Sequence, residues 1–160
     1  MGWDDRIRVV LKQKREPAGV TKLGTSSSRG STSYEDLVAW QRAMELVDAV
    51  YQATSRWPSD ERFGLTSQIR RAAVSIAANI AEGQGRNGRR EFLHHLGIAN
   101  GSACEVETMI RIATRQGYQS RDVETAMLGT AREVSRLVNG LIRAMQNSDQ
   151  SRLETRNQKP

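Results

Sequence analysis

The sequence predicts an all-α protein, an antiparallel up-down-up-down four-helix bundle that spans residues 33–147. Apolar residues recur every three or four positions through four long segments, which is the spacing of a helix with one buried face. The chain has three prolines, and none of them falls inside these segments. The connections between the segments are short, as expected where consecutive helices are antiparallel neighbours.

The first predicted helix begins near Ser33, which forms a capping-box pattern with Asp36 in place of the usual glutamate. It ends around Trp57, because the residue before a proline disfavours helical geometry. Spacings of three and four predict that one face of this helix is buried. That face comprises Leu37, Trp40, Met44, Val47, Tyr51 and Thr54.

The second predicted helix, Arg62–Gly88, is the central one of the bundle. A short turn at 59–62 and a bend at Gly64 precede it, and Gly83, Gly85 and Gly88 end it, since glycine is common just past a helix C-terminus. Many of its apolar residues are small, so a neighbouring helix can approach closely. The apolar stripe comprises Leu65, Ile69, Ala72, Ala73, Ile76 and Ile80.

A second line of residues on the same helix is polar. Polar groups that flank an apolar face need partners where they are buried. One interpretation is a network that holds the register of the bundle, with glutamates of the next helix (Glu105 and Glu107) pairing with its two arginines. The other is a subunit interface or an internal channel. The polar stripe comprises Arg70, Arg71, Ser75, Asn79 and Glu82.

The third predicted helix runs from about Arg89 to Gln116 and has a heptad-like apolar seam, as in left-handed bundle packing. The small residues Gly97, Gly101 and Cys104 form a groove beside this seam, and Gly117 ends the helix. The seam comprises Phe92, Leu96, Ala99, Ala103, Val106, Ile110 and Ala113.

The fourth predicted helix is capped by Ser120 and runs from about Arg121 to Gln146. The sequence is polar from Asn147 onwards, so we expect the C-terminal end to fray. The buried face comprises Val123, Met127, Val134, Val138, Leu141 and Met145, widened by Leu128, Leu137 and Ile142.

The basic charge of the chain is concentrated outside the predicted bundle. The formal net charge is +6 and the pI is about 10.1, which invites a nucleic-acid interpretation. Residues 1–32 carry seven basic against three acidic side chains, whereas residues 33–147 carry fourteen against thirteen. We expect residues 1–32 to be a disordered basic N-terminal arm, either a solvated or misannotated extension or an arm that binds RNA or a partner. We expect residues 148–160 to be a flexible polar tail.

Residues that carry chemistry are sparse, so the sequence predicts no enzyme, no cofactor and no metal site. The pattern G-x-G-x-x-G at 83–88 follows a helix rather than the strand of a dinucleotide-binding unit, so it is better interpreted as an interhelical turn. The adjacent His94 and His95 point about 100° apart on a helix and do not easily chelate one metal ion. Cys104 is expected to fill the core rather than to act as a nucleophile.

The single cysteine and the lengths of the apolar runs indicate the cellular compartment. One cysteine allows no intrachain disulfide, which fits a reducing environment. No apolar run reaches the roughly 20 residues needed to span a bilayer. The sequence therefore favours a cytoplasmic protein.

The turn after the second helix is the best candidate for contacting nucleic-acid phosphates. It opens onto the N-terminus of the third helix, where free backbone N–H groups favour anions. Arg86, Arg89 and Arg90 lie beside it. The alternative is an ordinary solvated helix start.

Six blocks of the sequence share the pattern of one known family. They are Tyr34–Leu37, Trp40–Gln41, Glu61–Ala72, Ser75–Ile76, Asn79–Gly83 and Glu91–Ser102. In these blocks the chain resembles the four-helix-bundle proteins encoded in intervening sequences of bacterial 23S rRNA genes. The resemblance covers about residues 34–145, and Leu65–Gly83 is its most distinctive block.

The resemblance implies a bundle that assembles as a homopentameric barrel. It also implies kinship with the accessory variability determinant protein of diversity-generating retroelements, which binds reverse transcriptase and nucleic acid through a basic surface. For most of the family no activity is defined. By position, the resemblance marks Arg70, Arg71, Asn79 and Glu82 as signature polar residues, and it places Arg86, Arg89 and Arg90 in the basic segment.

The chain departs from the family pattern in three places. Ala77 stands where the family often has proline, which predicts a straighter second helix. His95 replaces a usual aromatic residue and adds a pH-sensitive group. The basic arm at 1–32 is outside the pattern.

The sequence thus predicts a non-enzymatic homo-oligomer that associates with RNA through a basic surface. The alternative is a protein-interaction scaffold or an accessory subunit of a reverse transcriptase complex.

Overall fold

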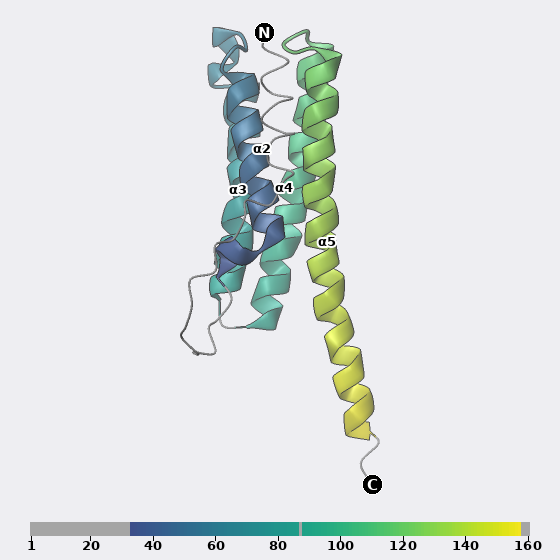
Figure 1. Cartoon of the computed structure of the whole chain (residues 1–160). Coiled ribbons are helices and arrows are strands. Elements are labelled where there is room, and N and C mark those ends of the chain that lie inside the picture. Colours follow the sequence, from purple (N-terminus) through teal and green to yellow (C-terminus); the bar gives the residue numbers. More distant parts are fainter. Residues whose placement is uncertain (1–32, 87, 158–160) are drawn as a thin grey trace, which may run out of the picture.

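The computed structural model describes residues 33–86 and 88–157 and confirms the all-α fold (Figure 1). The predicted arm 1–32 and the last three residues of the predicted tail, 158–160, lie outside the described residues. The elements are η1 (Tyr34–Asp36), α2 (Val38–Thr54), η2 (Ser59–Arg62), α3 (Leu65–Gly85), α4 (Arg89–Arg115) and α5 (Arg121–Asn157).

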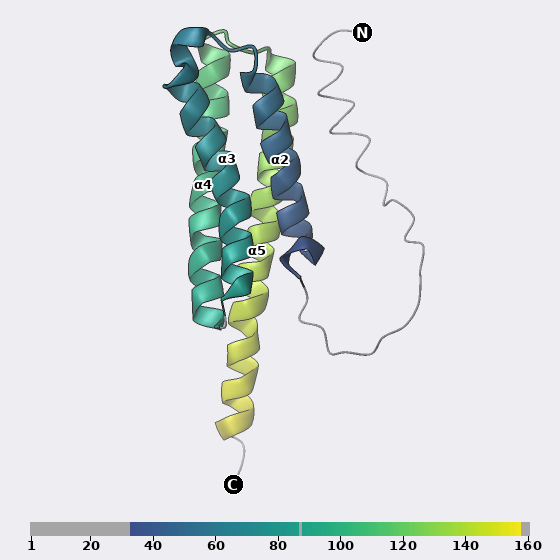
Figure 2. The same ribbon diagram turned by 90° about the vertical axis from the view of Figure 1, so that its left-hand side faces the viewer.

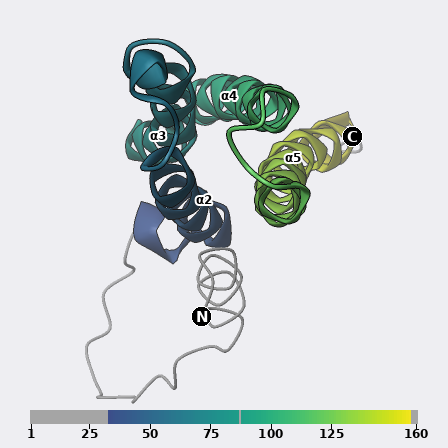
Figure 3. The ribbon, with the colours of Figure 1, turned by 90° about the horizontal axis from the view of Figure 1, so that it is seen from above.

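The four long helices form a bundle in which each helix packs against two neighbours. Helix α2 packs against α3 and α5, and α4 packs against the same two helices from the opposite corner. Figure 3 shows this order around the bundle from above. The connections α2–α3 and α4–α5 lie at one end of the bundle, and the connection α3–α4 lies at the other (Figures 1 and 2).

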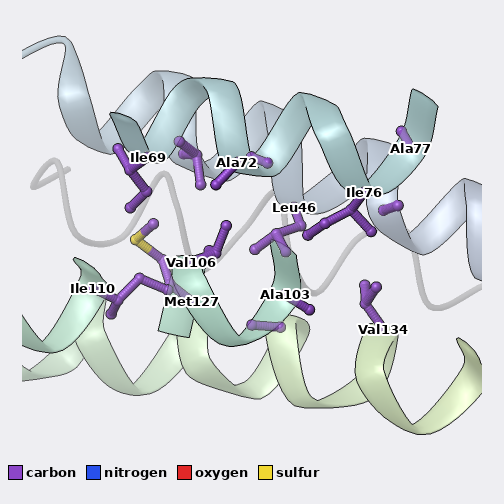
Figure 4. Close-up of a cluster of buried hydrophobic side chains, with 14 of the residues drawn as sticks. Leu46, Ile69, Ala72, Ile76, Ala77, Ala103, Val106, Ile110, Met127 and Val134 are labelled. Atoms are coloured by element: carbon purple, nitrogen blue, oxygen red, sulfur yellow. The ribbon is translucent and has the colours of Figure 1, made fainter. Parts of the chain in front are cut away.

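The core runs along the axis of the bundle and takes side chains from all four long helices. Leu46, Ile76, Val106 and Met127 come from α2, α3, α4 and α5 in turn, and each is fully buried. Figure 4 shows that these side chains point toward one another across the bundle. Burying one large aliphatic side chain contributes about 1.5–3 kcal/mol, so the core to which these four side chains belong contributes strongly to stability. The predicted seam of α4 is confirmed, since every one of its members is buried.

Helix α2 buries a different face from the one that its large apolar residues predict. Met44 and Tyr51 are 37% and 46% exposed, and Trp40 is half-buried. The buried face lies one residue away in sequence, which is about 100° around the helix. It consists mainly of alanines because they let α2 approach α3 and α5 closely. Its members are Ala39, Ala43, Leu46, Ala49, Val50, Ala53 and Thr54.

The helix ends follow the predicted capping residues with two differences. The Ser33–Asp36 capping box forms, but it caps the N-terminus of the short helix η1 rather than that of α2. Helix α2 begins afterwards at Val38. Gly117 has a φ of 75°, which suits glycine after a helix C-terminus. Ser120 Oγ accepts from the backbone N–H of Val123 at 3.3 Å and caps α5. The predicted end of α5 is wrong, because the helix continues to Asn157 and projects beyond the other helices (Figure 1).

Glu61 joins the two connections at one end of the bundle. Its Oε2 accepts from the backbone N–H of Leu65 at 2.7 Å, which caps α3, and its Oε1 accepts from the Tyr118 hydroxyl at 3.1 Å. This hydrogen bond raises the pKa of Tyr118, because the carboxylate favours the protonated phenol. A Cβ at Gly64 would overlap the Glu61 carboxylate, so a larger residue there would require the Glu61 side chain to shift.

Candidate functional site

The polar stripe of α3 divides between three environments. Ser75 and Asn79 turn toward α4, Arg70 reaches α2, and Arg71 lies exposed. The members of the stripe therefore make different contacts within the subunit. Its parts are best described one at a time.

The α4 side of the stripe is a chain of hydrogen bonds. Asn79 Nδ2 donates to the backbone oxygen of Ser75 at 2.8 Å and to its Oγ at 3.1 Å. Since the amide N–H groups of Asn79 point to Ser75, its Oδ1 faces His95 Nδ1 at 3.0 Å and can accept a hydrogen bond from it. Ser75 Oγ also bonds Ser102 Oγ at 2.9 Å. His95 and Ser102 are each 8% exposed, so the chain satisfies polar groups inside the bundle.

Helices α3 and α4 approach each other closely beside this chain of hydrogen bonds. A Cβ at Gly83 would lie 2.7 Å from His95 Cβ and 2.9 Å from the Phe92 ring, which is too close for any side chain. Gly83 is buried within α3 and does not end the helix, which continues to Gly85. The first glycine of the G-x-G-x-x-G pattern is thus a packing residue.

Glu82 lies where this chain of hydrogen bonds reaches the surface of the bundle. Its Oε1 accepts from Arg86 Nη2 at 2.6 Å and lies 3.9 Å from His95 Nε2. The hydrogen bond from Arg86, and then the charge of His95, lower the pKa of Glu82. In turn the carboxylate raises the pKa of Arg86. Arg86, which directly follows α3, is consequently paired with a carboxylate of that helix.

The predicted phosphate-contact residues gather at the α3–α4 end of the bundle. Arg90 is exposed in the first turn of α4, and the Arg86 side chain is 56% exposed. Arg89, the first residue of α4, is half-buried and has a partner of its own. Of the three, Arg90 is the most available to a ligand.

Arg70 has partners on α2 rather than on α4. Its Nε donates to Thr54 Oγ1 at 2.8 Å, and its guanidinium lies 4.7 Å from the centre of the Tyr51 ring. Glu107 instead pairs with Arg111 at 3.3 Å and with Arg132 on α5 at 4.0 Å. The predicted pairing of Glu107 with the arginines of α3 is therefore wrong.

Cys104 is exposed, so the prediction that it fills the core is wrong. The small residues beside the seam of α4 face away from the bundle. A Cβ at Gly97 or Gly101 would meet nothing within 4 Å. The periodicity placed these residues beside the seam correctly but did not show that none of the described helices packs against them.

An apolar groove lies on the outer surface between α2 and α3. We call it the α2–α3 groove. It has a volume of about 290 Å³. Two of the residues that line it, Met44 and Val74, are 37% and 43% exposed. Its lining residues are Tyr34, Trp40, Met44, Val47, Val74, Ala77, Ala78 and Ala81. Sequence reasoning assigned most of these residues of α2 to the core.

A second hollow lies between the end of α4 and the start of α5. We call it the arginine pocket. It has a volume of about 620 Å³ and is lined by Thr108, Arg111, Ile112, Arg115, Arg121 and Glu124. Sequence reasoning missed it because its arginines belong to two helices. The available signal was the spacing of Arg111 and Arg115, which share a face of α4 across one turn.

Two negative findings apply to residues 33–86 and 88–157. No three His, Cys, Asp or Glu side chains come together there in a way that could hold a metal ion. No helix in this part of the chain is both long and apolar enough to cross a bilayer.

Comparison with known proteins gives the family. A family model for the 23S rRNA-intervening sequence protein matches residues 35–140, which span the whole core of the bundle. The chain belongs to this family. No curated protein matches the chain.

A solved structure supports the fold of this family member. It is a crystal structure from Bacteroides thetaiotaomicron of a protein with unknown function from the S23 ribosomal protein family. The two chains are 24% identical with a TM-score of 0.62, and the match covers 66% of this chain and 96% of the other. At this identity the likeness shows a shared fold.

Proposed function

We propose that this member of the 23S rRNA-intervening sequence protein family is a non-enzymatic, cytoplasmic homo-oligomer that associates with RNA. The observation that carries the proposal is the exposed basic turn between α3 and α4 in a chain of this family. The turn presents arginines at the start of a long helix, where backbone N–H groups also favour phosphate.

Arg90 is the principal RNA contact in this proposal. It is exposed in the first turn of α4, whereas Arg86 is held by Glu82 at 2.6 Å and contributes less charge. Arg89 is half-buried and is therefore less accessible to a ligand. Contacts to phosphate supply affinity without sequence specificity, so the binding should be strongly salt-dependent.

The test is RNA binding by Arg90→Glu and by a matched control, Arg143→Glu. Arg143 is also exposed but lies on α5 and is not part of the turn. We expect Arg90→Glu to weaken binding of a single-stranded oligoribonucleotide about tenfold and to lower the salt slope by about one unit. Arg143→Glu should bind like the wild type. Absent binding, or binding that does not change with salt, would overturn the proposal.

The α2–α3 groove is the proposed contact between subunits. Its exposed apolar side chains would be removed from water by a second copy of the chain, which contributes about 25 cal/mol per Å² buried. The homopentamer implied by the family resemblance sets the expected stoichiometry. The polar stripe does not serve this role in the proposal, since its Ser75 and Asn79 are bonded inside the bundle.

Light scattering tests the assembly with Val74→Asp and the control Ile98→Asp. Both residues are similarly exposed, at 43% and 41%, but Ile98 lies on α4 outside the groove. We expect Val74→Asp to give the mass of one chain and Ile98→Asp to keep the oligomer, because a buried unpaired charge is costly. A wild-type chain that is monomeric at micromolar concentration would favour the alternative, a scaffold whose groove receives another protein such as a reverse transcriptase.

A further inference from the structure

The arginine pocket has more positive charge than its own carboxylates balance. Within it, Glu124 accepts from Arg121 Nη1 at 3.1 Å. Just outside it, Glu107 is shared by Arg111 at 3.3 Å and Arg132 at 4.0 Å. Arg115 is exposed and has no acidic partner within ion-pair distance among the described residues.

The charge count of this group decides what it can bind. Four arginines (Arg111, Arg115, Arg121 and Arg132) face two glutamates (Glu107 and Glu124), which leaves a net charge of +2. A phosphodiester carries one negative charge, whereas a terminal phosphate monoester carries about −1.5 to −2 at neutral pH. The terminal group therefore balances the pocket better than an internal phosphate does.

The shape of the pocket also suits a nucleotide. Its volume of about 620 Å³ falls within the range of about 300–1,000 Å³ that is usual for small-ligand sites. One wall is apolar, because the side chain of Ile112 is 39% exposed there. Such a wall can receive a ribose or a base while the guanidinium groups hold the phosphate. Arginine is well suited to this contact because its planar fork can donate two hydrogen bonds to one phosphate.

We propose that the arginine pocket binds a phosphate monoester, either the 5′-phosphate of an RNA strand or that of a free nucleotide. Arg115 is its principal ligand, and Arg121 and Arg111 reinforce the positive field. The site is separate from the proposed RNA contact at Arg90, since the α4–α5 and α3–α4 connections lie at opposite ends of the bundle (Figure 1). It can therefore hold the end of a strand independently of contacts along the strand.

The test compares two hexaribonucleotides of one sequence, one with a 5′-phosphate and one with a 5′-hydroxyl, by fluorescence anisotropy on the full chain. We expect the phosphorylated strand to bind about tenfold more tightly, which is the usual worth of a charge-assisted hydrogen bond. Arg115→Gln should abolish this preference, and Arg143→Gln should keep it. Both residues are exposed, so both variants should fold, which circular dichroism checks.

Adenosine 5′-monophosphate as a competitor separates the two sources of the phosphate. If it displaces the phosphorylated strand as effectively as an unlabelled copy of that strand does, the site takes free nucleotides. If the unlabelled strand competes better, the site takes RNA ends. Either result supports a phosphate-monoester site, provided that Arg115→Gln removes the effect.

Equal binding of the two strands to the wild type, or a preference that survives Arg115→Gln, would overturn the inference. This failure is distinct from a failure of the proposed RNA contact. Arg90→Glu should weaken both strands by the same factor and leave the preference for the 5′-phosphate intact. If Arg90→Glu abolishes binding of both strands and the wild type shows no preference for the 5′-phosphate, the protein has the RNA contact at the turn and lacks a phosphate site in the arginine pocket.

Discussion

The two edges of α3 are built in opposite ways. On the α4 edge, polar side chains pair inside the bundle, and Gly83 lets the two helices meet without a side chain between them. On the α2 edge, Arg70 bonds Thr54 near one end, but Val74 and Met44 remain partly exposed around an apolar groove. The polar edge is therefore closed, and the apolar edge is open.

This difference reverses the usual expectation for a helix in a bundle. Hydrogen bonds have a narrow geometry, so the chain from Ser75 to His95 fixes one register of α3 on α4. Apolar contacts tolerate more variation in geometry, which is compatible with a contact to another molecule. The exposed groove is thus better suited to an external contact than the polar residues are. The substitutions with the largest expected effects on stability lie on the α4 edge.

Gly83→Ala should have the largest effect on stability. The added Cβ would lie 2.7 Å from His95 Cβ, and neither atom can move without shifting its helix. We expect a loss of about 1–3 kcal/mol in the free energy of unfolding, as is typical of overpacking in a core. Urea denaturation followed by circular dichroism measures it.

The control for this substitution is Gly101→Ala in the middle of α4. A Cβ at Gly101 would meet nothing within 4 Å, so the only change is in helix propensity. Alanine should stabilise the protein there by up to about 1 kcal/mol. A tolerated Gly83→Ala would show that α3 and α4 are not closely packed at this point.

Asn79→Ala should have an intermediate effect. It removes the acceptor of His95 Nδ1 and the donor to Ser75, and His95 is 8% exposed, so its ring would lose a buried partner. The expected loss is about 1–2 kcal/mol, the cost of leaving a buried polar group unsatisfied. The double variant with His95→Phe should recover part of it, because the orphaned N–H is then gone. Full additivity of the two losses would rule out direct coupling between Asn79 and His95.

The sequence predicted the buried apolar stripes of α3 and α4 better than it predicted the buried face of α2. The 4-3-4-3 spacing of Phe92, Leu96 and Ala99 located the core of α4, and the same reasoning gave the buried stripe of α3. These predictions succeed because each helix carries one clear apolar stripe. The capping residues Ser33 and Ser120 were also recognisable, because capping depends on local sequence.

The features that the sequence did not reveal depend on how helices face one another. In α2, Leu46 and Tyr51 belong to two apolar stripes that differ by one residue, and only packing decides which is buried. The bond between Asn79 and His95 joins residues from two helices, so neither residue alone indicates it. The arginine pocket was missed for the same reason, since Arg115 and Arg121 come from different helices.

Glu82→Gln should have the smallest effect, and its pH dependence tests the surface end of the closed edge. Arg86 and His95 lower the pKa of Glu82 in the folded protein, so the ionised group stabilises the fold above the unfolded pKa of about 4.3. That contribution is lost as the pH falls through the lower, folded-state pKa. The melting temperature of the variant should therefore lie below that of the wild type at neutral pH, and the two should converge in acid. Glu105→Gln, an exposed carboxylate of α4 outside this chain of contacts, should show no such convergence. A difference in melting temperature that stayed constant with pH would mean that Glu82 acts through packing rather than through its charge. It would contradict an electrostatic role for its contacts with Arg86 and His95.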